Sequence, residues 1–181
     1  MVQLPQPERK LLVIGFGNTL RRDDALGCLI AREVEAWRRQ GVQALSVAQL
    51  TPELALTIAD AQAVYFVDAR GGPTCSEVQV EELEPLESAT PSMVHASSPR
   101  FLLGLCRAAW GRCPPSWLVS VPAVDFEIGE GLSAVAELGM QQALDTIDWL
   151  ITSALREPAA QSAGPAGVAA HSRHSTPDQR P

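Results

Sequence analysis

The hydrophobic positions of the chain fall into short segments that alternate between two patterns. Residues 11–15 and 63–67 are continuous apolar runs, which are typical of strands in a parallel sheet covered on both faces. Residues 25–39 instead carry apolar side chains three and four positions apart, the spacing of one face of a helix. The two patterns alternate from residue 10 to residue 156, and this alternation predicts an α/β fold.

Further segments complete the predicted sheet and its helices. Shorter strand patterns occupy residues 45–48, 117–121 and, as an edge strand, 75–80. Thr51-Pro52 and Ser98-Pro99 each combine an N-cap residue with a first-turn proline, so we expect helices that end near residues 60 and 110. A long helix is expected over residues 133–155. Right-handed connections then give a three-layer α/β/α sandwich around a mostly parallel, roughly five-stranded sheet.

The two ends of the chain differ in composition from the part between them. From residue 157 onward Pro, Ala, Gly and Ser dominate, so the segment cannot bury enough apolar surface to offset its ordering entropy. We expect an N-terminal arm at residues 1–9, one domain at 10–156 and a disordered tail at 157–181. Prolines interrupt the N-terminal segment and no long apolar run follows, so we expect a cytoplasmic protein.

The net charge and the cysteine content of the chain limit the classes of partner that we expect. The formal net charge of -7 disfavours a non-specific surface for nucleic acid or anionic membranes. The four cysteines show neither a C-x-x-C pair nor zinc-type spacing, so neither a disulfide framework nor a zinc cluster is indicated. We expect reduced, mostly buried cysteines in a monomer whose partners are proteins, metals or small molecules.

The segment GFGNTLRRDDALG, residues 15–27, follows the first predicted strand and carries candidate chemistry. Its G-x-G start resembles a phosphate-binding loop, but a dinucleotide-binding loop needs a small residue where Leu20 stands, and the Walker G-K-[ST] is absent. Asp23 and Asp24 would also repel a phosphate. The segment is therefore predicted to receive a cation, although both aspartates would equally suit a helix N-terminus, whose dipole they complement.

Two other candidates are predicted at the same edge of the sheet. Asp68 follows an apolar strand, and ligands bind at the carboxyl ends of strands in such folds. His95 is the only histidine of the predicted domain and lies in the loop-like TPSMVHASSP. Each residue alone also suits a structural role. Together with one of the two adjacent aspartates, of which only one can face the strand ends, they form a plausible open site for a divalent metal.

The segment from Gly15 to Gly27 resembles the signature of the hydrogenase maturation endopeptidases, which trim the C-terminus of the large subunit of nickel-iron hydrogenases. YFVDA with Asp68, the loop histidine His95 before a leucine-rich helix, and DFEIGEGLS before the final helix fall in the family's order. The resemblance covers nearly the whole predicted domain. It implies a compact α/β/α endopeptidase whose partner is the precursor of a [NiFe]-hydrogenase large subunit.

The resemblance also implies the residues of the site. Asp24, Asp68 and His95 correspond to the residues that recognise nickel already inserted in the substrate, so no permanent cofactor is expected. The family often has glutamate at position 24 and glycine at position 25, and Asp23 therefore stays open as an alternative ligand. Gly15, Gly17 and Asn18 are implied to shape the loop.

Two other functions stay open on the sequence. A non-catalytic, nickel-dependent assembly factor or metallochaperone would use the same site, and a nucleotide-binding module is suggested by the strand–GxG–helix order. Neither an H-E-x-x-H zinc motif nor a G-x-S-x-G serine elbow is present. Whether nickel only docks the enzyme or also polarises the scissile carbonyl is likewise open.

Overall fold

A computed structural model describes residues 10–72, 77–86 and 98–156. The predicted arm 1–9, the predicted tail 157–181 and His95 lie outside the described residues. The elements, in chain order, are β1 (Leu11–Phe16), the 3-10 helix η1 (Arg22–Ala25), α1 (Leu26–Ala36), β2 (Val42–Val47), α2 (Leu54–Ala59), β3 (Ala63–Gly71), β4 (Gln79–Glu82), α3 (Pro99–Trp110), β5 (Ser116–Ala123) and α4 (Ala134–Arg156).

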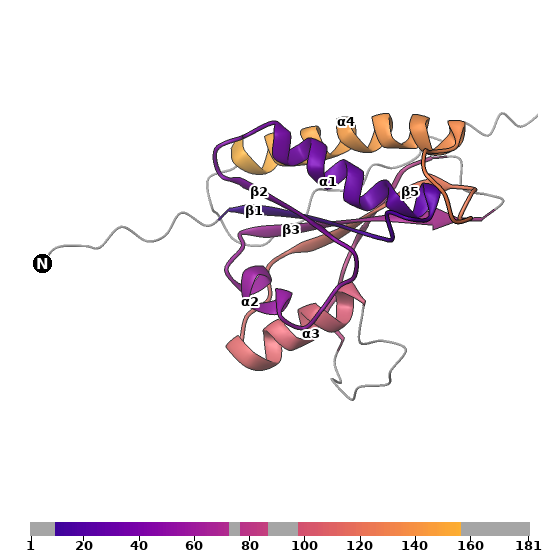
Figure 1. The fold of residues 1–181 in the computed structure, drawn as a ribbon. Coiled ribbons are helices and arrows are strands. Elements are labelled where there is room, and N and C mark those ends of the chain that lie inside the picture. The colour runs from indigo at the N-terminus through magenta and orange to yellow at the C-terminus, as the bar shows by residue number, and fades with distance from the viewer. Residues whose placement is uncertain (1–9, 73–76, 87–97, 157–181) are drawn as a thin grey trace, which may run out of the picture.

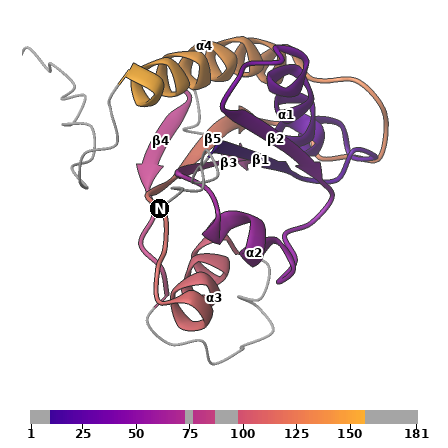
Figure 2. The ribbon, with the colours of Figure 1, turned by 90° about the vertical axis from the view of Figure 1, so that its left-hand side faces the viewer.

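The strands form one five-stranded sheet in the order β2-β1-β3-β5-β4. The first four are parallel, and β4 pairs antiparallel with β5 at the edge. Helices α1 and α4 cover one face of the sheet, and α2 and α3 cover the other (Figures 1 and 2). The predicted α/β fold with a mostly parallel sheet and helices on both faces is thus confirmed.

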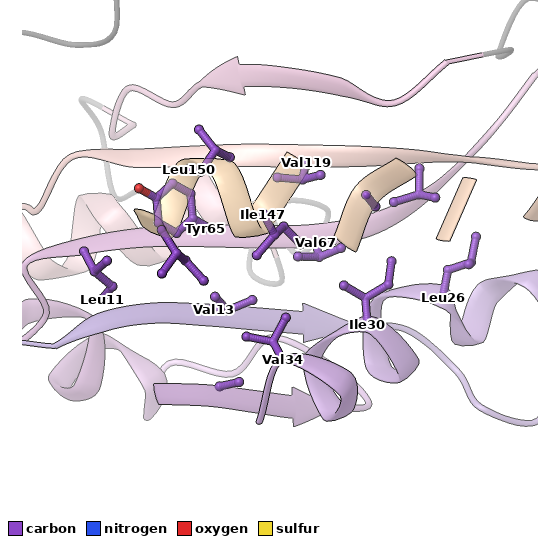
Figure 3. Packing of buried hydrophobic residues seen from close by; sticks show 14 of the residues in the cluster. Leu11, Val13, Leu26, Ile30, Val34, Tyr65, Val67, Val119, Ile147 and Leu150 are labelled. Carbon is purple, nitrogen blue, oxygen red and sulfur yellow. The ribbon is translucent and has the colours of Figure 1, made fainter. Parts of the chain in front are cut away.

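Burial on both faces explains the continuous apolar runs. Along β1, Leu11 and Val13 pack toward α1 and α4, whereas Leu12 and Ile14 pack on the opposite side, because successive strand residues point to opposite faces. Figure 3 shows the first of these cores, where Val13 lies among side chains of α1, α4 and the central strands. A strand with only one covered face would instead have shown alternating apolar and polar residues.

Several boundaries differ from the prediction. Strand β3 runs to Gly71 rather than residue 67, so Asp68 lies within the strand and not after it. Strand β4 occupies Gln79–Glu82 rather than residues 75–80, of which residues 75 and 76 are outside the described part. The predicted cap Ser98 is confirmed, since its Oγ accepts a hydrogen bond from the Phe101 backbone N–H at 3.3 Å. The predicted cap at Thr51 is wrong, because α2 begins at Leu54 without a side-chain cap.

The cysteines agree with the prediction where they are described. Cys28 and Cys106 are buried, Cys113 is partly exposed, and all three are free thiols. Burial raises the pKa of Cys106 to about 11, so its thiol stays protonated at neutral pH. Within the described ranges, no helix combines the length and the apolar content that a membrane span needs.

Candidate metal-recognition site

Helix α1 meets the sheet through glycines. A Cβ on Gly27 would lie 2.3 Å from the Phe16 carbonyl oxygen and 2.5 Å from that of Val67, distances that no side-chain carbon tolerates. A Cβ on Gly15 would lie 1.8 Å from the Gly27 carbonyl oxygen. The start of the helix therefore rests on the backbone of β1 and β3, and η1, which precedes it, is placed at the carboxyl ends of both strands.

Replacing Gly27 with alanine is expected to destabilise the fold by about 1–3 kcal/mol, because the helix must move away from both strands. Urea unfolding measures this change. The exposed Arg32 of the same helix supplies the control, since Arg32→Ala should change the free energy of unfolding by less than about 0.5 kcal/mol. Equal stability of the two variants would contradict the close contact.

The loop between β1 and η1 is folded around Asp24. Gly17 has φ 142°, and a Cβ there would lie 2.0 Å from the Asp24 carbonyl oxygen. The Asn18 backbone N–H donates to the Asp24 carboxylate (Oδ2) at 3.1 Å, and the Asn18 side chain accepts from the Leu20 N–H at 2.9 Å. Close packing and local turns thus account for the glycines and the asparagine without a bound phosphate.

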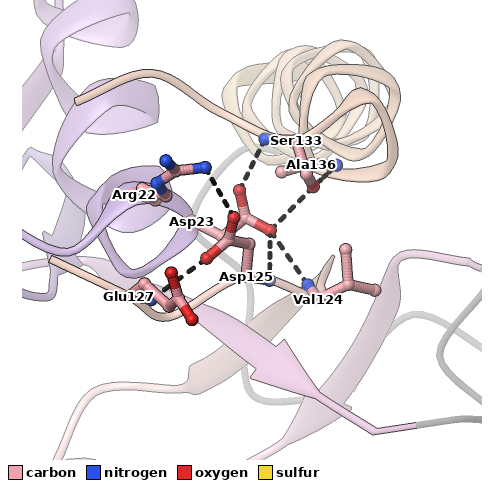
Figure 4. A network of polar contacts seen from close by, with 7 residues as sticks. All are labelled: Arg22, Asp23, Val124, Asp125, Glu127, Ser133 and Ala136. Carbon is pink, nitrogen blue, oxygen red and sulfur yellow. Dashed lines mark hydrogen bonds and ion pairs between the residues drawn. The ribbon is translucent and has the colours of Figure 1, made fainter. Parts of the chain in front are cut away.

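Asp23 points toward the connection between β5 and α4 (Figure 4). Its side chain is fully buried, and its carboxylate accepts four hydrogen bonds from the β5–α4 connection. The Val124 and Asp125 backbone N–H groups each donate to Oδ2 at 2.9 Å, while Ser133 donates from its backbone N–H to Oδ1 and from its Oγ to Oδ2, both at 2.7 Å. Hydrogen bonds within the protein already use the oxygens of this carboxylate. Asp24 is therefore the candidate metal ligand of the two adjacent aspartates.

These four hydrogen bonds also determine the protonation state of Asp23. Burial raises the pKa of this carboxyl, but the hydrogen bonds, led by that from the Ser133 backbone, outweigh burial and hold the pKa below its ordinary value. Asp23 is therefore ionised at neutral pH. Its role in the structure is to tie η1 to the loop before α4.

Asp68 is the second acidic residue at this edge. The pKa of its carboxyl is raised to about 6, chiefly by burial and to a smaller extent by the charge of Asp24, while a hydrogen bond from the Ala69 backbone acts in the opposite direction. The 3-10 helix η1, which carries Asp24, contacts strand β3, which carries Asp68. Strand alternation places Asp68 on the sheet face of Phe66, the face that α2 and α3 cover.

The third predicted residue, His95, lies outside the described residues. Within residues 10–72, 77–86 and 98–156, no group of three or more His, Cys, Asp and Glu side chains is placed to hold a metal ion. Of the three predicted residues, Asp24 and Asp68 are therefore the two that lie in the described part of the chain. Carboxylate oxygens from two separate elements can supply part of a divalent-ion site but need further ligands to complete it.

A set of contacts around η1 was not foreseen from the sequence. Arg22 pairs with Asp125 (Nη1 to Oδ2, 2.7 Å), and its backbone N–H donates to the Gly129 carbonyl at 3.1 Å. Arg21 donates from Nε to the Phe126 carbonyl at 3.0 Å. The only sequence signal for these contacts was DFEIGEGLS at residues 125–133, whose two glycines mark a turn-rich loop. Together they fix the loop that carries Asp24 against the β5–α4 connection.

Comparison with solved structures shows the same fold in hydrogenase maturation proteases. The hydrogenase maturating endopeptidase HybD from E. coli is 22% identical, with a TM-score of 0.64 over 80% of this chain and 93% of that one. The [NiFe] hydrogenase maturation protease HycI from Thermococcus kodakarensis is 21% identical, with a TM-score of 0.63 over 79% and 92%. A hydrogenase 2 maturation peptidase from a Thaumarchaeota archaeon is 19% identical, with a TM-score of 0.60 over 80% and 99%.

Comparison of the sequence alone does not assign the chain to a family. No protein-family model matches the chain, and no curated protein matches it. The likeness to the maturation proteases therefore concerns the fold, which spans nearly the full length of those proteins.

Proposed function

We propose that the protein is an endopeptidase that removes the C-terminal peptide from the nickel-loaded precursor of a [NiFe]-hydrogenase large subunit. One feature carries the proposal: Asp24, in η1, and Asp68, in β3, lie where η1 contacts the carboxyl end of the sheet, and besides burial the charge of Asp24 contributes to the raised pKa of Asp68. The fold is that of the hydrogenase maturation proteases, and ligands of such sheets bind at this edge. A cation brought by a substrate would relieve the repulsion.

In this proposal Asp24, Asp68 and His95 bind the nickel ion that the precursor carries. Two carboxylates and an imidazole suit a borderline divalent ion, provided that the acids are ionised and the imidazole is neutral. Because the ion arrives with the substrate, the enzyme needs no cofactor of its own. A precursor without nickel would lack the group that these residues bind, and the protease would leave it uncut.

Nickel serves first as a recognition element in this account. Binding the ion fixes the C-terminal segment of the precursor against the enzyme, and such positioning converts an encounter into an effectively intramolecular reaction. The water that attacks the scissile peptide bond needs a proton acceptor. In the proposal, a carboxylate oxygen of the site that does not bind nickel accepts that proton.

Processing is expected to slow as the pH falls through about 6. Asp68 must be ionised, and with its pKa raised to about 6 most of its charge is lost at pH 5. An unperturbed imidazole at His95 would protonate near pH 6.5 and act in the same direction. Initial rates should therefore fall about 10-fold or more between pH 7 and pH 5. Circular dichroism at each pH controls for unfolding, and a flat profile would remove both residues from the site.

The experiment that tests the function is a mass measurement on the precursor. Purified protein is incubated with a nickel-loaded precursor and, in parallel, with the same precursor lacking nickel. We expect shortening only where nickel is present. Failure to shorten the nickel-loaded precursor would reject the peptidase, and nickel-dependent association without a change in mass would assign the protein as an assembly factor instead.

A further inference from the structure

Arg22 has a backbone conformation that arginine rarely adopts. Its φ is 38°, in the left-handed region, which disfavours every residue that carries a Cβ and leaves glycine free. The other non-glycine residue with positive φ in the described part of the chain is Arg38, at 48°, which directly follows Trp37, the C-cap of α1. A left-handed residue is ordinary after the end of a helix. Arg22 lies at the start of η1 instead, so its conformation needs a separate explanation.

The β5–α4 connection holds Arg22 in this conformation. The Arg22 backbone N–H donates to the Gly129 carbonyl at 3.1 Å, and the Asp23 N–H donates to the Asp125 carbonyl at 3.0 Å. The Arg22 guanidinium adds an ion pair with Asp125 at 2.7 Å (Figure 4), but its side chain is 43% exposed, and exposed pairs contribute little. The backbone hydrogen bonds, rather than the charge, are therefore the main constraint on Arg22.

The conformation of Arg22 sets the directions of the two aspartates that follow. Arg22 is the second residue of a turn that the Asp24 N–H closes by donating to the Arg21 carbonyl at 2.9 Å. Successive residues of a 3-10 helix point about 120° apart. With the turn in this form, the Asp23 carboxylate faces the β5–α4 connection, and the Asp24 carboxylate accepts the Asn18 backbone N–H at 3.1 Å.

A residue at position 22 that left the left-handed region would change the direction in which the chain enters η1. At least one of these backbone hydrogen bonds would break, and both aspartates would turn about the axis of η1. Asp24 would then move away from the N–H of Asn18. The strained residue is thus kept by the same contacts that fix Asp24, a combination that is common at functional sites.

We infer that Arg22 is a positioning residue: its left-handed backbone makes Asp24, rather than Asp23, the aspartate that the protein presents to its substrate. The inference rests on the proposed function, in which Asp24 binds the nickel of the precursor. Arg22 itself contacts neither the nickel nor the peptide. It acts through the orientation of η1.

Substitution by valine and by glycine separates the backbone of Arg22 from its charge. Both substitutions remove the guanidinium, but valine strongly disfavours positive φ, whereas glycine adopts it freely. Full-length variants are compared by their affinities for nickel-loaded and nickel-free precursor. Wild-type protein and Arg22→Gly should bind the nickel-loaded form at least about 10-fold more tightly, and Arg22→Val should keep a preference of at most about twofold.

Arg38→Val is the matched control. It places the same substitution at the other left-handed arginine, just before β2, whose first residue Val42 pairs with Leu11 at the edge of the sheet opposite Asp24. Arg38→Val should lose stability for the same reason as Arg22→Val and keep the full preference for nickel. Circular dichroism shows that each variant is folded at the temperature of the binding measurement. If a valine variant does not fold, alanine replaces valine at both positions, since alanine also disfavours positive φ.

A second measurement needs no precursor. Because the Asn18 N–H donates to the Asp24 carboxylate, the amide proton resonance of Asn18 in the NMR spectrum reports the position of Asp24. In Arg22→Val this resonance should move toward its position in Asp24→Ala, which lacks the acceptor. In Arg22→Gly and Arg38→Val it should stay near its wild-type position.

The outcomes separate this inference from the proposed function. If wild-type protein does not prefer the nickel-loaded precursor, the proposed function fails, and the Asn18 resonance alone decides whether Arg22 positions Asp24. If wild-type protein shows the preference and Arg22→Val keeps it, the inference is overturned while the function stands. An equal loss in Arg22→Gly, or in Arg38→Val, would also overturn the inference, because it would assign the effect to the charge or to general instability.

Discussion

Replacing Asp68 with asparagine is expected to abolish processing of the precursor and, at the same time, to stabilise the folded protein at pH 7.5. The pKa of Asp68 is raised from its ordinary value of 3.8 to about 6, chiefly by burial. A carboxyl group whose pKa is higher in the folded state favours folding below the unfolded pKa and loses that contribution as the pH rises through about 6. Above pH 6 the ionised Asp68 therefore lowers the free energy of unfolding. Replacing it with a neutral amide removes this destabilisation.

The expected gain is about 1–2 kcal/mol at pH 7.5 and close to zero at pH 4, measured by urea unfolding. Processing should fall at least about 100-fold, as expected for the loss of a group that acts on the reacting centre. Asp60→Asn is the control, because Asp60 is exposed and pairs with Arg112 at 3.0 Å on the surface, where such pairs contribute little. A variant that is less stable at pH 7.5, or one that still processes the precursor, would contradict this assignment of Asp68.

Replacing Asp23 with alanine should have the largest effect on stability, a loss of about 3–5 kcal/mol. The substitution would leave the backbone N–H groups of Val124, Asp125 and Ser133 buried without their acceptor. The loop that carries Asp24 would also lose its link to the start of α4. Because small domains are stable by only about 5–15 kcal/mol, much of the variant should be unfolded at elevated temperature.

Thermal and urea unfolding of Asp23→Ala and Asp24→Ala, side by side, measure this difference. Asp24→Ala should change stability by about 1 kcal/mol at most, since it removes one hydrogen bond and also the repulsion with Asp68. Because the pKa of Asp23 is lowered on folding, its stabilising contribution is present above the ordinary value of 3.8 and is lost as the pH falls through the folded pKa. Equal stability of the two variants would show that Asp23 does not anchor the loop.

The architecture was predictable because a strand buried on both faces can be recognised from its own residues. The runs at β1 and β3 are apolar throughout, and the helix patterns between them require a parallel arrangement with crossovers. The edge strand β4 was misplaced because all four of its residues are exposed and its position is set by pairing with β5, which comes much later in the chain. The extension of β3 through Asp68 to Gly71 likewise depends on pairing with β5 up to Ala123.

The site was only partly predictable for a similar reason. Helical geometry indicated that just one of the adjacent aspartates can face the strand ends. It could not tell which, because the groups that bind Asp23 come from Val124, Asp125 and Ser133, about a hundred residues away. Strand topology did predict that one of the two adjacent aspartates and Asp68 lie at the same edge of the sheet, since the carboxyl ends of β1 and β3 meet there.

In the proposed function, Asp24 and Asp68 together bind the nickel of the substrate. The most direct test compares the affinity of full-length protein for nickel-loaded and nickel-free precursor. Wild-type protein and Asp60→Asn should bind the nickel-loaded form at least about 10-fold more tightly, and the double variant Asp24→Asn, Asp68→Asn should bind both forms equally. A double variant that kept the preference for the nickel-loaded precursor would show that these two carboxylates do not bind the nickel.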